Sequence, residues 1–161
     1  MISPGQKLPS VTIKQATAEG GADVDPAALF AGKKVVIFSL PGAFTPTCSQ
    51  KHLPGYVAKL PELKAQGVDL VACLSVNDAW VMQAWAEQHD AVGKIVMLAD
   101  GSGAFTKALG IETDLGPHHM GLRARRGVIV AENGVVKSID MEAPGKFEVS
   151  SADACLIGLK K

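Results

Sequence analysis

The sequence lacks several features that define specialised classes of protein. Its 161 residues contain only three cysteines, at positions 48, 73 and 155, and 5% aromatic residues. An odd number of widely spaced cysteines fits neither a disulfide framework nor the paired Cys or His ligands of a zinc site. The longest apolar runs, residues 35–40 and 68–76, are far shorter than the ~20 residues that cross a bilayer. We therefore expect free thiols, no metal cofactor and no membrane association.

A charge imbalance is also absent. The chain has 16 basic and 16 acidic residues, a formal net charge of +0 at pH 7. Proteins that bind nucleic acid use an excess of positive charge against the phosphates, so we expect no nucleic-acid partner. Residues 1–7 contain no basic stretch followed by an apolar segment, as a secretory signal would. We expect a cytoplasmic protein, or one of an organelle matrix if it is processed from a precursor.

Hydrophobic residues, by contrast, are plentiful. They make up 47% of the chain, which is enough for a core, and no repeat or linker divides the sequence. Residues 1–161 are therefore predicted to form a single domain. Continuous apolar runs are typical of strands that are buried on both faces of a sheet, and they occur at residues 35–40, 68–76 and 94–99.

Helix signals follow each of these runs. Thr45 suits an N-cap and Pro46 the first helical position, so a helix is predicted from here toward Gln66. Pro54 and Pro61 are the places where this helix can kink or divide. Two further helices are predicted after the next strands, over residues 79–89 and through a short segment that ends at residue 109.

The C-terminal part predicts a hairpin and a final helix. Residues 127–132 and 135–140 flank Asn133-Gly134, a strong signal for a tight β-turn. Ser150-Ser151 can cap a helix that runs to Lys160. Strand–helix units that close with a hairpin and a helix predict an α/β protein with a thioredoxin-like fold, in which helices flank a central mixed sheet.

Cys48 is the residue whose position favours chemistry. It follows the first predicted strand, at the edge where open α/β sheets bind ligands. In a helix that begins at Pro46 it lies in the first turn, among unpaired amide donors and at the positive end of the helix dipole, where a thiolate is stabilised. A dense cluster of positive charge lies further along the chain, at Arg123, Arg125 and Arg126. From these residues alone, a buried structural cysteine and a solvated basic loop remain alternatives.

Two motifs surround this cysteine: PGAFTPTCS over residues 41–49 and HLPG over residues 52–55. They resemble the active-site signature of the peroxiredoxins, in the branch that contains mammalian peroxiredoxin 5 and the plant type II enzymes. The similarity extends over nearly the whole chain, as far as ENGVVK at residues 132–137. The resemblance implies a thioredoxin-like fold and a peroxidase that reduces hydrogen peroxide and small alkyl hydroperoxides without metal, haem or flavin.

The resemblance also implies roles for individual residues. Cys48 would be the peroxidatic cysteine, which attacks a peroxide oxygen and becomes a sulfenic acid. Thr45 and Arg126 would complete the catalytic site by holding both peroxide oxygens. Pro41 would shield the thiolate, and Arg123 would support the site.

Two neighbouring residues are given structural interpretations. Arg125 is predicted to point toward solvent. His52, one helical turn beyond Cys48, is interpreted as a partly exposed structural histidine, although a tuning role for it stays open.

Regeneration of Cys48 needs a second thiol. The place of the mammalian resolving cysteine is taken by Ser150, and Cys155 is predicted to pack on the apolar face of the last helix. Cys73 matches the second cysteine of the plant enzymes, but it lies within a predicted strand, where a disulfide with Cys48 would need backbone movement. We expect an external reductant, glutathione with glutaredoxin first and thioredoxin second, and a transient Cys48–Cys73 disulfide stays open. The resemblance further implies a homodimer.

Two other functions are compatible with a reactive cysteine. Cys48 could serve as a peroxide-sensing redox switch, which would stop after one oxidation instead of turning over. A Cys–His hydrolase would pair Cys48 with a histidine, yet none of the four histidines lies in a recognised protease context. The adjacent pair His118-His119 lacks partner ligands at metal-binding spacing, so no metal site is predicted there.

Overall fold

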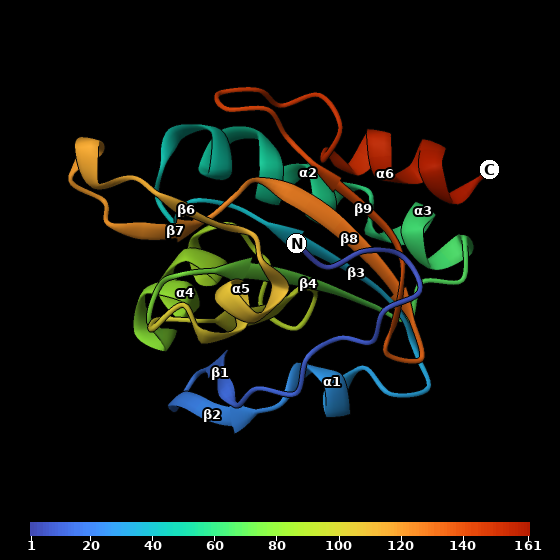
Figure 1. The fold of residues 1–161 in the computed structure, drawn as a ribbon, viewed down its shortest axis with the longest axis horizontal. Helices are drawn as coiled ribbons and strands as arrows, with labels where there is room; N and C mark the ends of the chain where they lie inside the picture. The colour runs from blue at the N-terminus through green and yellow to red at the C-terminus, as the bar shows by residue number, and fades with distance from the viewer.

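The computed structural model describes residues 1–161 and shows a central sheet with helices on both sides (Figure 1). The sheet contains β1 (Ile13–Thr17), β2 (Gly20–Val24), β3 (Lys34–Ser39), β4 (Leu70–Ser75), β5 (Val96–Ala99), β8 (Gly127–Glu132) and β9 (Val135–Met141). A separate hairpin is formed by β6 (Glu112–Asp114) and β7 (Leu122–Ala124). The helices are α1 (Pro26–Leu29), α2 (Leu53–Ala58), α3 (Leu60–Ala65), α4 (Ala79–Gln88), α5 (Ala104–Leu109) and α6 (Ala152–Leu159).

The strand order is β2-β1-β5-β4-β3-β8-β9. β3 pairs with β4 and β4 with β5 in parallel, whereas β8 and β9 add to the other side of β3 in antiparallel register. The sheet is therefore mixed and flanked by helices, as the thioredoxin-like α/β class requires. None of the helices has the length and apolar character needed to span a bilayer.

Two apolar clusters lie on opposite faces of the sheet and explain the continuous apolar runs. Along β3, Val36 and Phe38 point into a cluster with α2, α3, α4 and α6, while Val35 and Ile37 point into a cluster with α1 and α5. Successive side chains of a strand face opposite sides, so burial on both sides needs apolar residues at every position. The predicted central strands are confirmed.

The helix predicted from Thr45-Pro46 toward Gln66 is divided. The segment starts as predicted at Pro46, and a π-helical turn, η1 (Cys48–His52), follows, in which the Leu53 amide donates to the Cys48 carbonyl five residues before. α2 then ends and α3 begins around Lys59, two residues before Pro61. Proline has no amide hydrogen and disfavours helical geometry in the residue before it, which accounts for the break.

Both predictions for the C-terminal part are confirmed. Asn133 and Gly134 have φ angles of 48° and 76° between β8 and β9, as a turn with two left-handed residues requires. The hydroxyl of Ser151 accepts a hydrogen bond from the Ala154 amide at 3.1 Å and so caps α6.

A pair of glycine substitutions tests this backbone geometry. Gly134→Ala should lower the free energy of unfolding by about 1 kcal/mol, because alanine is strained at positive φ. Gly158→Ala should raise it by roughly 0.5–1 kcal/mol, because Gly158 lies in α6 with open space around it and alanine favours helix. Urea denaturation measures both; a Gly134→Ala variant as stable as the parent would contradict the turn geometry.

Candidate active site

Cys48 lies just beyond the carboxyl end of β3, in the first turn of the helical segment. The Ser49 amide donates to the Thr45 carbonyl at 2.9 Å, so the chain is already helical at this point. The Cys48 side chain is fully buried and belongs to the larger apolar cluster. The first-turn position predicted for Cys48 is therefore confirmed, and the thiol is hidden from bulk solvent.

Arg126 is brought to Cys48 by the sheet. It precedes β8, whose first residue Gly127 pairs with Ser39 at the end of β3. Its guanidinium Nη2 donates to Cys48 Sγ at 3.0 Å, and Nη1 lies 2.8 Å from His52 Nδ1. A hydrogen bond from a cation is charge-assisted and stronger than one between neutral groups. Of the basic cluster, Arg126 alone bonds to the cysteine.

His52 is a fully buried member of the site, so the interpretation as a partly exposed histidine is wrong. Its Nε2 lies 3.0 Å from the Ser150 carbonyl oxygen. A carbonyl can only accept, so Nε2 holds the proton and Nδ1 is free to accept from Arg126. Burial, and then the charge of Arg126, lower the pKa of His52 to about 3. The neutral imidazole accepts a hydrogen bond from the guanidinium and so orients it, without adding a second positive charge beside it.

The sequence carried one signal for this role of His52. It lies four residues after Cys48, a spacing that places two side chains on the same face of a helix.

The segment between β9 and α6 covers the site, and Figure 1 shows it arching past α2. The buried Glu142 carboxylate accepts hydrogen bonds from the amides of residues 148–150 at 2.8–2.9 Å and from the Ser150 hydroxyl at 2.6 Å. Burial acts to raise the pKa of Glu142, but these hydrogen bonds lower it overall. The Ser150 carbonyl in turn accepts from Tyr56 of α2 at 2.8 Å. The Glu142 carboxylate thus fixes Ser150, and the hydrogen bond from Tyr56 to Ser150 holds the segment against α2.

Phe147 of this segment lies against the reactive groups. Its ring centroid is 5.1 Å from that of His52, in an edge-on arrangement, and 5.9 Å from Cζ of Arg126. A guanidinium at this distance from an aromatic ring is attracted by the ring's quadrupole. Phe147 therefore helps to fix the orientation of Arg126.

Thr45 and Pro41 belong to the loop before the helix. Thr45 stands at the predicted N-cap position before Pro46, but its hydroxyl accepts no amide of the first turn; it donates to the Gly42 carbonyl at 2.7 Å instead. Arg123 Nη1 donates to the Pro41 carbonyl at 3.2 Å and thereby fixes the position of the loop. A Cβ at Gly42 would lie 2.9 Å from that Nη1, so glycine permits the close approach.

Arg125 does not extend freely into solvent as predicted. Its side chain is half-buried, and Nη2 donates to the Glu142 carbonyl at 3.5 Å. No carboxylate lies within ion-pairing distance of it.

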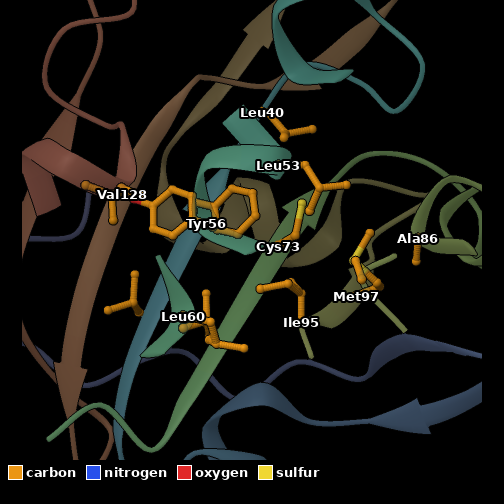
Figure 2. Close-up of a cluster of buried hydrophobic side chains, with 14 of the residues drawn as sticks. Leu40, Leu53, Tyr56, Leu60, Cys73, Ala86, Ile95, Met97 and Val128 are labelled. Carbon is orange, nitrogen blue, oxygen red and sulfur yellow. The ribbon is translucent and has the colours of Figure 1, made fainter. Parts of the chain in front are cut away.

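The other two cysteines are buried free thiols. Cys73 lies within β4, in register with Phe38 of β3, and Figure 2 shows it among apolar side chains near Leu53. Burial, followed by the nearby Cys48, raises the pKa of the Cys73 thiol well above its usual value. Burial also raises the pKa of Cys155 to about 11. Neither thiol has the environment of a reactive cysteine in this conformation.

The depressed pKa of His52 predicts a pH-dependent stability. In the unfolded chain this histidine would have its usual pKa of 6.5, whereas in the folded chain its pKa is about 3. The stabilisation is complete above pH 6.5 and is lost as the pH falls toward 3, at about 1.4 kcal/mol per pH unit once the unfolded histidine is protonated. Denaturation of parent and His52→Gln at pH 7.0 to 4.5 should show a shallower decline in the variant; parallel declines would contradict the assignment.

The whole chain is similar to known proteins. Residues 3–156 match the Redoxin family. The curated protein Peroxiredoxin-2E, chloroplastic, from Arabidopsis thaliana is 47% identical over 98% of this chain and 69% of its own length. Among solved structures, reduced Prx3 from Vibrio vulnificus in complex with hydrogen peroxide has a TM-score of 0.94 and 53% identity, with 99% of both chains covered.

A further solved structure, at lower sequence identity, is also similar over nearly the whole chain. Peroxiredoxin 5 from Alvinella pompejana superposes with a TM-score of 0.87 at 32% identity, again with 99% of both chains covered. The motifs around Cys48, the fold and these relatives agree. This chain therefore belongs to the peroxiredoxins, in the branch of the plant type II enzymes and peroxiredoxin 5, and is a thiol-dependent peroxidase.

Proposed function

We propose that Cys48 is the peroxidatic cysteine and that Arg126 and Thr45 hold the peroxide against it. The observation that supports this most directly is the 3.0 Å bond from Arg126 Nη2 to the buried Sγ. The Thr45 proton is already donated to Gly42, so the lone pairs of its oxygen are free to accept the O–H of a peroxide.

In this proposal the Cys48 thiolate attacks one peroxide oxygen and the O–O bond breaks. The sulfur becomes a sulfenic acid, and the other oxygen leaves with a proton as water or an alcohol. Negative charge moves from sulfur to the leaving oxygen, and the Arg126 guanidinium is placed to stabilise it throughout. The fully buried sulfur favours hydrogen peroxide and small alkyl hydroperoxides over bulky ones, and Pro41 is proposed to shield it.

We propose that an external thiol reduces the sulfenic acid: glutathione with glutaredoxin as the first choice and thioredoxin as the second. Cys73 is fully buried within a central strand, Cys155 is buried on α6, and neither is joined to Cys48 by a disulfide. Ser150 is held by Glu142 and bears a hydroxyl in place of a thiol. A Cys48–Cys73 disulfide remains the competing route.

We further propose that the protein acts in a reducing compartment such as the cytoplasm, because all three cysteines are free thiols.

We also propose a homodimer that forms through the active-site loops. Phe44 is 50% exposed at a left-handed φ of 65°, and Trp80 is 73% exposed. The Ala43 amide, next to Phe44, donates to Asn77 Oδ1 at 3.0 Å just before α4, the helix that carries Trp80. Exposed aromatic side chains, one of them at a strained position, suit burial against a second copy.

Removal of the guanidinium tests the catalytic assignment. Arg126→Met should lower kcat/KM for hydrogen peroxide by about 10²–10³-fold, the range for loss of one preorganised charge-stabilising donor. Lys137→Met, which removes an equal charge from the exposed side of β9, is the matched control and should be unchanged. Stopped-flow oxidation, followed by the fluorescence of Trp85, measures the rates, because the Trp85 indole donates to Ser49 next to Cys48. Equal rates for Arg126→Met and the parent would contradict the proposal.

Substitution of each cysteine tests which thiol turns over. Cys48→Ser should abolish consumption of peroxide, whereas Cys73→Ser and Cys155→Ser should sustain it with glutathione and glutaredoxin. Consumption is followed over many equivalents of peroxide per protein. Arrest after one equivalent in the parent, with every reductant, would indicate a redox switch instead of an enzyme. Loss of turnover in Cys73→Ser would indicate an internal disulfide.

A further inference from the structure

A pocket of about 330 Å³ is lined in part by Arg126, the residue that also bonds to Cys48. Its walls come from the β6–β7 hairpin with the 3₁₀ turn η2 (Gly116–His118), from the segment after β9, and from the loop at Pro41. Figure 1 shows this hairpin extending from one edge of the molecule. The volume is at the lower end of the range for small-molecule sites. Arg126 therefore contacts both the pocket and the reactive sulfur.

The charges that line the pocket are mainly positive. Arg125, Arg126 and Lys146 line it, and none of them has a carboxylate within 4.0 Å. Glu142 is the one acidic residue among the lining residues, and its two carboxylate oxygens already accept the amides of residues 148–150 and the Ser150 hydroxyl. His118 adds a further nitrogen donor or acceptor. Arg126 is engaged by Cys48 and His52, so Arg125 and Lys146 are the cations available to bind an anion.

We propose that this pocket binds the carboxylate groups of a low-molecular-weight thiol while its sulfur reaches Cys48; the proposal rests on the peroxidase function above. Hydrogen peroxide is small and uncharged, so it needs neither the volume nor the cations. Cys48 is fully buried, which favours a reductant small enough to enter beside Arg126. Arg125 is the principal anchor, because it is a half-buried lining residue and a guanidinium can bind a carboxylate with two parallel hydrogen bonds.

The step that the pocket would serve balances with two molecules of such a thiol. The sulfur of the first attacks the sulfenic sulfur of Cys48, an S–S bond forms, the S–O bond breaks, and the thiol proton leaves with the oxygen as water. The second thiol, as its thiolate, attacks the sulfur of the first. Cys48 leaves as a thiolate, and the two small thiols leave as their disulfide. Two electrons pass from the thiols to the former sulfenic sulfur.

The test compares thiols with and without carboxylates on protein oxidised by one equivalent of hydrogen peroxide. Glutathione and 2-mercaptoethanol are the probes, and the rate of formation of the mixed disulfide is measured by quenched-flow mass spectrometry. Arg125→Met should slow glutathione by about tenfold, the scale expected for loss of a charge-assisted contact, and should leave 2-mercaptoethanol within twofold of the parent. Arg125→Lys should recover part of the glutathione rate. Lys137→Met is the control for charge removed elsewhere.

The outcomes separate this proposal from the one on which it rests. Equal slowing of both thiols by Arg125→Met would make the residue a structural support and overturn the binding site, as would an unchanged glutathione rate. Slower oxidation by hydrogen peroxide with normal reduction by glutathione would assign the pocket to the peroxide and also overturn it. A parent protein that hydrogen peroxide does not oxidise at Cys48 would contradict the peroxidase function itself.

Discussion

The hydrogen bond from Arg126 to Cys48 is the contact on which the site depends, because a buried thiolate is costly without a cation beside it. The fold provides this pair by placing the turn before β8 next to the end of β3. The guanidinium is itself held on two further sides, by the neutral imidazole of His52 and by the ring of Phe147. In the proposed mechanism, both oxygens of a peroxide meet a charge that is already in position, so little reorganisation is needed during the reaction.

A second constraint lies in the covering segment, where one buried carboxylate organises nine residues. Glu142 accepts the amides of residues 148–150, and the Ser150 carbonyl accepts from His52 and Tyr56. The segment therefore contributes the partner that fixes the tautomer of His52, the ring that faces Arg126 and one wall of the cationic pocket. Structure far along the chain thus determines the electrostatics around a cysteine at the start of a helix.

Much of this was predictable from local pattern. Apolar runs identified the central strands, Asn133-Gly134 the hairpin, and Thr45-Pro46 the start of the helix with Cys48 in its first turn. The edge hairpins β1–β2 and β6–β7 were not predicted, because short exposed strands have no continuous apolar run. The burial of His52 and the direction of the Thr45 hydroxyl were also missed. Each depends on a single carbonyl, of Ser150 and Gly42 respectively, whose position tertiary packing decides.

The central claim is that Cys48 forms a sulfenic acid which no other cysteine of the chain needs to resolve. The most direct measurement is the intact mass of the Cys73→Ser/Cys155→Ser variant after one equivalent of hydrogen peroxide, followed by glutathione. The account predicts a product one oxygen heavier, then a glutathione adduct, both located at Cys48 by peptide mapping and both seen in the parent protein. An unchanged mass in the variant, or a parent product two hydrogens lighter that forms no adduct, would contradict it.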